Sequence, residues 1–296
     1  MPSRTNPLRE IEAFNRGRLP NLLALKYRKM AATPFGYFRG TNHLFHAAWP
    51  GQAWLERMPA VWLNGDLHLE NFGTYRGDNR LVYFDVGDFD DGCLGPAGRD
   101  LARFLVGLSL VARELGLGRS EGALARIFLA AYRGALGGGK ARWIERRTAT
   151  GLIGMLLKDL ERRTQADLLL KRTQVKKRGR RLREDTGKAL KLPKAERDRV
   201  IAFMERFARH RADPDFFTVL DVAQRVAGIG ALGLPRYVVL IRGSGRPDGA
   251  ALVDLKWPTD RTRVPRGRRG QRVEGRVGTA GRAEGAGEPR AHAPAG

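Results

Sequence analysis

Apolar residues recur at helical spacing over much of the middle of the chain. The clearest case is residues 100–115, where one face of the predicted helix collects these apolar side chains: Leu101, Phe104, Leu105, Leu108, Val111, Ala112 and Leu115. The glycines that follow this stretch favour a helix end there. Similar patterns predict further helices at 121–136, 143–163 and 194–210.

Toward the C-terminus the pattern becomes that of strands. Residues 216–226, 236–241 and 250–256 are rich in Val and Leu and predict β-strands. The last two are joined by the turn-forming sequence GSGRPDG. Shorter strands are predicted at 61–63 and 81–85. Helices first and an antiparallel sheet last predict an α+β fold.

The last forty residues have a different composition from the rest. Residues 257–296 hold nine Arg and no Lys, and they contain no Leu, Ile, Phe, Tyr or Met. Such a segment cannot form a core, which predicts a disordered tail. The expected organisation is an N-terminal extension at 1–25, a helical region at 26–213, a β-rich region at 214–256 and this tail.

Composition limits the disulfides, zinc sites and membrane segments that the chain can form. A single cysteine, Cys93, excludes an intramolecular disulfide and a multi-cysteine zinc site. The longest apolar stretch, residues 104–112, is far short of the roughly 20 residues that a membrane helix needs. The N-terminus lacks an apolar signal core. We therefore expect a cytoplasmic protein that does not associate with membranes.

The net charge of +23 would attract anionic partners. Much of the local excess lies at residues 171–183, where eight of thirteen residues are basic. This segment is interpreted as a solvated hairpin or loop. A nucleic-acid-binding stripe is the alternative, although no aromatic residues are interleaved for stacking on bases.

Acidic residues concentrate in one part of this basic chain. The sequence NGDLHLENFG at 64–73 is followed by YFDVGDFDD at 83–91, and together they hold these carboxylates: Asp66, Glu70, Asp85, Asp88, Asp90 and Asp91. Such density favours a cation, and oxygen ligands with few histidines suit Mg²⁺. Asn71 can add a carbonyl ligand, and Asp66 can accept a proton from a hydroxyl. Asp100 is interpreted as a helix cap or loop clamp.

GDLHLEN followed by DFDDGCLGPAGRDLA resembles the catalytic core of aminoglycoside phosphotransferases and choline kinases, in the protein-kinase-like superfamily. The resemblance implies that Asp66 is the catalytic aspartate and that Asn71 and Asp88 bind Mg²⁺, with Asp90 as a second metal ligand. Whether Asp85 or Asp88 is the main ligand stays open.

One position departs from that pattern. Asn64 stands where these enzymes usually carry a histidine of mostly architectural role.

A glycine motif lies between the two predicted strands at 216–226 and 236–241. Gly228, Gly230 and Gly233 form G-x-G-x-x-G, but a strand follows instead of the helix that a dinucleotide site needs. Strand, glycine turn and strand is the layout of a kinase phosphate-covering loop, and the next strand ends on Lys256 as a phosphate-binding lysine would. A plain hairpin is the alternative.

The order of these parts is reversed relative to kinases, because the loop and Lys256 follow Asp66. We therefore expect a circularly permuted kinase-like fold, with a mostly helical catalytic half first and an antiparallel nucleotide-loop half last.

The whole chain is similar to a narrower bacterial family, the domain of unknown function 2252 family. The matching motifs are KMAATPFGYFRG, NGDLHLENFG, DFDDGCLGP and DVAQRVAGIGALGLPRYVVL. The similarity spans about Tyr27 to Lys256. Relatives typically continue Lys-Glu-Ala and a further long segment, so the chain is expected to be C-terminally incomplete.

The leading hypothesis is a phosphotransferase that moves the γ-phosphoryl group of ATP, with Mg²⁺, to a hydroxyl of a small molecule or protein. The resemblance implies both cofactors, and this chain is expected to be weakly active or inactive. Two alternatives stay open: a nucleotide-binding pseudo-enzyme, and a basic protein that binds nucleic acid non-specifically.

Overall fold

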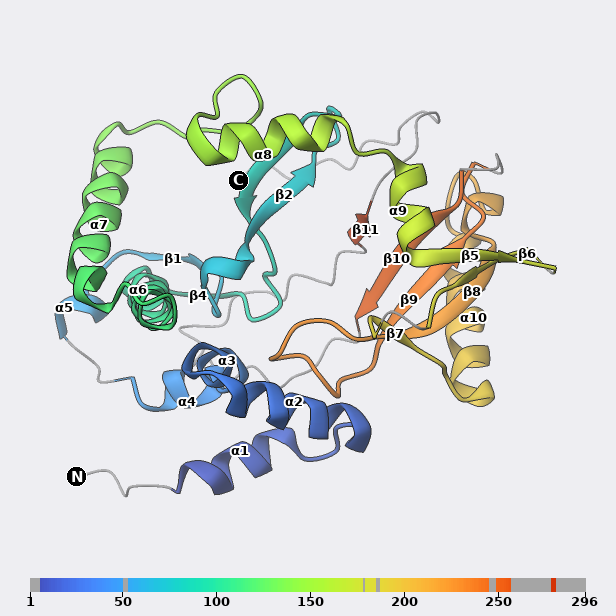
Figure 1. Cartoon of the computed structure of the whole chain (residues 1–296), viewed down its shortest axis with the longest axis horizontal. Helices are drawn as coiled ribbons and strands as arrows, with labels where there is room; N and C mark the ends of the chain where they lie inside the picture. Colours follow the sequence, from blue (N-terminus) through green and yellow to red (C-terminus); the bar gives the residue numbers. More distant parts are fainter. Residues whose placement is uncertain are drawn as a thin grey trace. The chain divides into compact units, whose positions relative to one another are not determined.

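The chain divides into two compact units in a computed structural model. The structure describes residues 6–49, 53–177, 179–184, 187–244, 249–256 and 278–280. The first unit comprises residues 1–162, 226–235 and 256–276, and the second comprises 163–225, 236–255 and 277–296. The fold is mixed α+β with small antiparallel sheets, which confirms the expected class (Figure 1).

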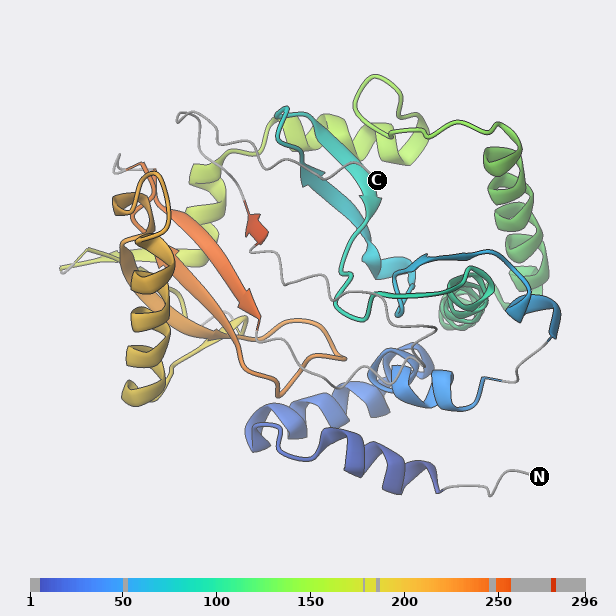
Figure 2. The same cartoon turned by 180° about the vertical axis from the view of Figure 1, so that it is seen from behind.

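The first unit begins with short helices where an N-terminal extension was predicted. They are α1 (Pro7–Asn15), α2 (Pro20–Ala32), α3 (Pro34–Gly40), α4 (Asn42–Ala47) and α5 (Ala53–Glu56). The first three each begin with proline, whose fixed φ suits the first helical position. The side chain of Thr33 caps α3, and α2 packs against α3 (Figure 2).

Two small antiparallel ladders of the first unit frame the acidic sequence. Their elements are β1 (Ala60–Leu63), the 3-10 turn η1 (Leu69–Asn71), β2 (Phe72–Arg76), β3 (Val82–Val86) and β4 (Cys93–Pro96). In the β1–β4 pair Leu63 lies opposite Cys93, and in the β2–β3 pair Phe72 lies opposite Val86. The loops 64–71 and 87–92 are therefore joined at both ends, which brings the two acidic loops next to each other.

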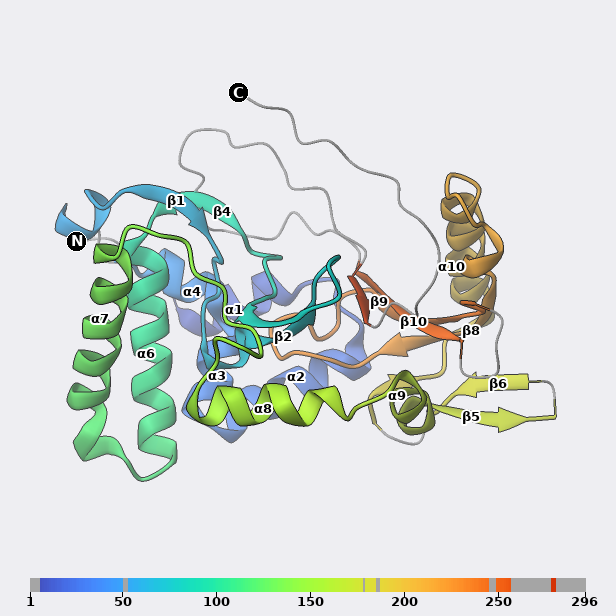
Figure 3. The ribbon, with the colours of Figure 1, turned by 90° about the horizontal axis from the view of Figure 1, so that it is seen from above.

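Three longer helices complete the first unit: α6 (Gly98–Glu114), α7 (Glu121–Gly137) and α8 (Gly151–Glu161). Helices α6 and α7 pack side by side (Figure 3), as the apolar pattern predicted. The third predicted helix was too long, since it was expected to begin at 143. The carbonyl of Ile144 instead accepts a hydrogen bond of 2.8 Å from the N–H of Phe84, so this segment lies along the edge of β3.

In its described residues, the second unit consists of a five-stranded sheet, two helices and a hairpin. Its elements are α9 (Gln165–Arg172), β5 (Thr173–Lys176), β6 (Gly179–Leu182), β7 (Ala189–Leu190), α10 (Lys194–Ala208), the 3-10 turn η3 (Asp215–Phe217), β8 (Val219–Arg225), β9 (Arg236–Ile241), β10 (Ala251–Lys256) and β11 (Gly278–Ala280). The sheet order is β11-β10-β9-β8-β7. The three long strands and α10 confirm the prediction, and β5 with β6 confirms a hairpin in the basic segment.

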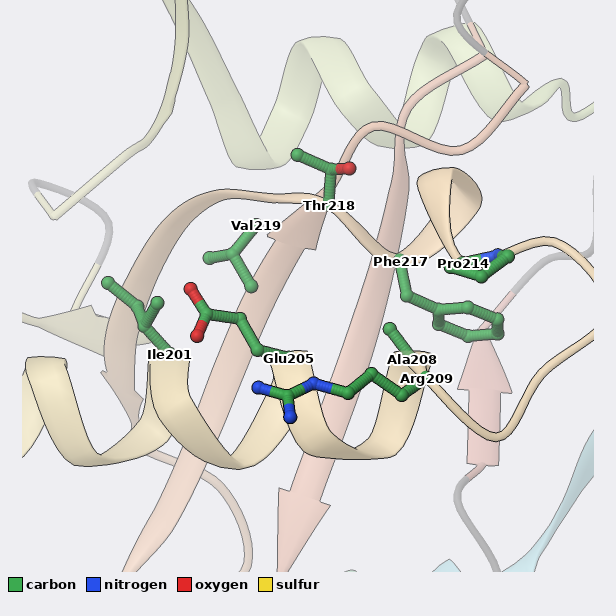
Figure 4. Close-up of a pocket in the computed structure, with 8 residues that line it drawn as sticks. All are labelled: Ile201, Glu205, Ala208, Arg209, Pro214, Phe217, Thr218 and Val219. Carbon is green, nitrogen blue, oxygen red and sulfur yellow. The ribbon is translucent and has the colours of Figure 1, made fainter.

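Apolar residues bury both faces of this sheet. Val239 and Ile241 pack in one cluster with Met204 of α10, whereas the intervening Leu240 packs on the other face with Leu169 of α9. The alternation follows the two-residue period of a strand. A pocket of about 350 Å³ lies between α10 and the start of β8 (Figure 4), and it contains no predicted site residue.

Two expectations about segments are refined. The predicted disordered tail falls mainly on residues 257–277 and 281–296, which lie outside the described residues, and Gly278–Ala280 forms strand β11 beside β10. The glycine-loop segment 226–235 groups with the first unit and not with the sheet. Among the described residues, every helix is too short or too polar to cross a bilayer.

Candidate active site

A clamped turn begins the candidate site directly after β1. Gly65 has a φ of +82°, and a side chain there would collide with the carbonyl of Asp91. The carboxylate of Asp100 accepts hydrogen bonds from the N–H groups of Asn64 (2.6 Å) and Gly65 (3.1 Å), which confirms its predicted role as a loop clamp. Burial lowers the pKa of His46 to about 4, so the neutral ring donates from Nε2 to the Gly65 carbonyl at 2.8 Å.

Asp66, which lies in this turn, forms an ion pair with a buried arginine of α6. Nε of Arg103 donates to Oδ1 of Asp66 at 2.7 Å, and Nη2 contacts the same oxygen. Arg103 is fully buried, and its guanidinium carbon lies 3.9 Å from the ring centroid of Phe38. Burial raises the pKa of Asp66 to about 7, against the lowering effect of Arg103. Asp66 is therefore a carboxylate that can exchange a proton near neutral pH.

Asn64 joins the two loops of the site. Its Oδ1 accepts from the N–H of Asp66 (3.3 Å) and from Nδ2 of Asn71 (3.2 Å). Its Nδ2 donates to the carbonyls of Gly87 (2.9 Å) and Asp88 (3.1 Å). An asparagine at this position thus serves both loops at once, with its acceptor toward one and its donor toward the other. The structure places Asp66, Asn71 and Asp88 around Asn64, through the backbone of Asp66 and Asp88 and the side chain of Asn71. Their convergence on one cation site stays a prediction.

The predicted metal ligands lie beside a lysine. Nζ of Lys256 donates to Oδ1 of Asp88 at 2.9 Å and also contacts Asp90. Asp88 has a φ of +57°, a strained conformation that aspartate tolerates better than most residues. Asp85 lies apart from this group, because its carboxylate accepts a hydrogen bond from the N–H of Val86 and makes no contact with Lys256 in the described structure.

The donor set suits a hard cation in part. Oδ1 of Asn71 is buried and has no hydrogen-bond partner among the described residues. An amide oxygen and a carboxylate together are a reasonable pair of Mg²⁺ ligands, since this ion usually keeps few protein ligands and fills its shell with phosphate and water. No group of three His, Cys, Asp or Glu side chains suited to a metal occurs within the described residues. The residues present therefore fit Mg²⁺ held together with a phosphate, and not a closed protein cage.

The glycine loop is a tight turn fixed to the N-terminal helices. Gly228 and Gly233 have φ values of +67° and +88°, which favour glycine. The carbonyl of Gly233 accepts from the N–H of Leu19 at 3.0 Å. A side chain added to Gly230 would lie 3.5 Å from the carbonyl of Arg39. The loop thus lies against the end of α3.

Two buried cations hold the carbonyls of this loop. Nη1 of Arg18 donates to Gly230 at 2.8 Å and to Leu232 at 2.6 Å, and Nζ of Lys26 donates to Gly230 at 3.1 Å. Lys26 is fully buried. Burial, followed by the charge of Arg18, lowers the pKa of Lys26 to about 7, whereas Asp66 opposes this shift. The field of Asp66 therefore reaches the lysine that supports the glycine loop.

A third cation lies at the same end of α3. Arg39 forms an ion pair with Glu70 and contacts the ring of His68. Burial, followed by the charges of Arg39 and Arg103, lowers the pKa of His68 to about 3, so this ring is neutral. His68 caps the 3-10 turn by accepting from the N–H of Glu70 at 3.1 Å. The histidine of the GDLHLEN motif is therefore a local cap.

Sequence reasoning missed the supporting cations. Arg18 and Lys26 lie at or near the segment interpreted as an extension, and nothing in their spacing indicates that they contact a loop more than 200 residues away. Arg103 had a weak signal, because it follows Asp100 by three residues and so lies on the same face of the predicted helix. Its position on the same helix face as the clamp residue Asp100 was the local indication that Arg103 belongs to the site.

Comparison with known proteins places the chain in a family. The sequence profile of a family described as uncharacterized proteins conserved in bacteria (DUF2252) matches residues 18–273. The chain belongs to this family. The DUF2252 match begins before Tyr27 and continues past Lys256, where the resemblance was expected to end.

Two further comparisons gave no relatives. No curated protein matches the chain. No solved structure matches it. The narrower resemblance noted in the sequence is thus confirmed, and the kinase-like one stays a hypothesis.

Proposed function

We propose that this DUF2252 protein is a phosphotransferase that uses Mg²⁺ and ATP and acts on a hydroxyl acceptor. The observation that carries the proposal is the Asn64 network, which links Asp66, Asn71 and Asp88 within one unit. These are the three residues to which the kinase-like resemblance assigns proton acceptance and metal binding. Their convergence through a residue that replaces the usual histidine supports the resemblance.

Asn71 and Asp88 are the residues that would hold Mg²⁺, with Asp90 as a further ligand. Their support is the unpartnered Oδ1 of Asn71 in the described structure and the adjacent carboxylates. Mg²⁺ held by these residues would supply neutralisation of the charge that builds up on the transferred group. Lys256 would move from the carboxylates to a phosphate, because the cation takes its place beside Asp88.

Asp66 would act on the acceptor. The hydroxyl oxygen of the acceptor forms a bond to the γ-phosphorus while its proton passes to the carboxylate of Asp66. The bond from the γ-phosphorus to the bridging oxygen breaks, and ADP leaves with that electron pair. A pKa near 7 suits a group that must take a proton at neutral pH and release it afterwards.

The glycine loop would supply phosphate contacts. Arg18 and Lys26 occupy its carbonyls, and the N–H groups of Gly228 and Gly230 make no hydrogen bond within the described part of the chain. Backbone N–H groups with nearby fixed cations are a suitable anion site. The loop between β8 and β9, followed by a strand that ends on Lys256, supports a kinase-like fold in circularly permuted order.

A nucleotide-binding protein without turnover is the second candidate. The observation that favours it is the double contact of Lys256 with Asp88 and Asp90, which neutralises two predicted metal ligands within the chain itself. In this case nucleotide binding would regulate a partner and would not lead to phosphoryl transfer.

Turnover of γ-labelled ATP tests the proposal. Asp66→Asn should lower the rate by roughly 10²–10⁴, the usual contribution of a positioned general base, and should leave nucleotide binding intact. Asp85→Asn is the matched control, because this nearby carboxylate is exposed and lies outside the network. Binding without turnover in the wild type would favour the second candidate. Absence of both would contradict both candidates.

A further inference from the structure

Arg103 directs its closest donors to one of the two carboxylate oxygens of Asp66. Both Nε and Nη2 of the guanidinium lie on Oδ1. Oδ2 faces His68, whose Nε2 lies 4.0 Å away, beyond hydrogen-bond distance. The two oxygens of this carboxylate are therefore chemically distinct before any substrate arrives.

The arginine itself has no freedom to turn. It is fully buried, its Nη2 donates to the carbonyl of Phe38 at 3.1 Å, and its guanidinium carbon lies 3.9 Å and 5.0 Å from the ring centroids of Phe38 and Phe45. A planar group stacked in this way presents its donors in one fixed direction. A lysine could supply the charge but not the two-point contact.

We propose that Arg103 is a positioning residue that fixes Oδ1 of Asp66 and leaves Oδ2 as the oxygen that accepts the proton of the acceptor hydroxyl. This inference rests on the proposed function and assigns the reactive atom within it. The arginine also opposes the rise in the pKa of Asp66 that burial causes.

Several titratable groups on the surrounding elements face Asp66. The groups are Arg103 of α6, Arg39 of α3, Lys26 of α2, Asp91 of the loop before β4 and the neutral His68. Arg103 is the cation in direct hydrogen-bond contact with the carboxylate. Its removal should therefore change the titration of Asp66 more than removal of the others.

The first test does not need activity. The pKa of Asp66 is measured from its carboxyl ¹³C shift in the full chain, with Asp66→Asn to assign the signal. Arg103→Lys should raise this pKa, and Arg103→Met should raise it further, by about 1 unit or more. Arg113→Lys is the control, because Arg113 lies on the same helix but pairs with Glu121 at the surface. An Asp66 pKa that stays the same in Arg103→Lys would overturn the proposal, even if Arg103→Met does not fold.

The second test uses turnover. In Arg103→Lys, kcat should fall about ten- to a hundredfold through misplacement of Oδ2, with KM for ATP little changed. The acid limb of the kcat–pH profile should move upward by the shift seen in the spectrum. A limb that stays in place while the spectrum shifts would contradict the assignment of Asp66 as the base. A wild type without turnover contradicts only the proposed function, and the spectroscopic titration then decides the role of Arg103.

Discussion

The two units differ in whether charged side chains are among their most deeply buried residues. In the second unit, Val239, Leu240 and Ile241 are fully buried in apolar clusters on both faces of a sheet. In the first unit, the fully buried side chains include Arg103 and Lys26, which lie around the acidic loops. Apolar burial stabilises a fold, whereas buried charge costs desolvation that its partners only partly offset. We therefore expect the buried charges of the first unit to serve chemistry more than stability.

Removing Arg103 should produce the largest change. Arg103→Met leaves Asp66 buried without its partner, and breaking such a pair costs about 3–5 kcal/mol of unfolding free energy. The cost should grow from pH 6 to pH 9, because the folded variant holds the Asp66 proton to higher pH than the wild type does. Denaturant unfolding at the two pH values measures this. Adding Asp66→Asn should recover part of the loss; no recovery would show that the pair is not the cause.

Truncating the sheet core should lower the free energy of unfolding by an amount that does not depend on pH. Ile241→Ala removes a fully buried side chain and should cost about 2–5 kcal/mol of unfolding free energy. The cost should be the same at pH 6 and pH 9, since no charged group is involved. The same unfolding experiment measures it. A pH-dependent cost would remove the distinction between the two interiors.

The wild type itself should carry a pH signature of the site. Burial raises the pKa of Asp66 from its usual value to about 7, so the folded state holds a proton that the unfolded state has released. Stability should therefore fall as pH rises from about 4 to about 7, by at most about 1.4 kcal/mol per pH unit. The difference in unfolding free energy between wild type and Asp66→Asn, measured across this range, isolates the effect. A pH-independent difference would contradict the raised pKa.

These differences explain what could be predicted from sequence. The strands of the second unit and helices α6, α7 and α10 were predictable because apolar periodicity is a local signal. Asp66, Asn71 and Asp88 could be singled out as candidates because their motif is compact along the chain. The hydrogen bonds from Arg18 and Lys26 to the carbonyl of Gly230 were not predictable. They join segments more than 200 residues apart, and no sequence pattern links those segments.

The start of α8 shows a further limit of prediction from sequence. The amphipathic pattern continued to residue 143, but hydrogen bonds to the edge of β3 took precedence over helix formation there. Tertiary contacts decide such boundaries, and the pattern of one segment does not contain them.

The basic hairpin should give the smallest effect. Lys176→Gln with Lys177→Gln changes two exposed residues near the turn between β5 and β6 and should alter unfolding free energy by less than about 0.5 kcal/mol. If the hairpin binds nucleic acid, the slope of the logarithm of the binding constant against the logarithm of salt concentration should fall in magnitude by roughly 1 to 2. The control is the exposed pair Lys188→Gln with Lys191→Gln. Equal slopes in both variants would remove the hairpin as a nucleic-acid site.

Binding of Mg²⁺ with a non-hydrolysable ATP analogue tests the central claim most directly. Titration calorimetry on the full chain should detect binding that depends on Mg²⁺. Asp88→Ala should abolish that dependence, whereas Asp85→Ala should retain it, because only Asp88 lies in the network with Asn64 and Lys256. Equal, Mg²⁺-dependent binding by the wild type and Asp88→Ala would contradict the account.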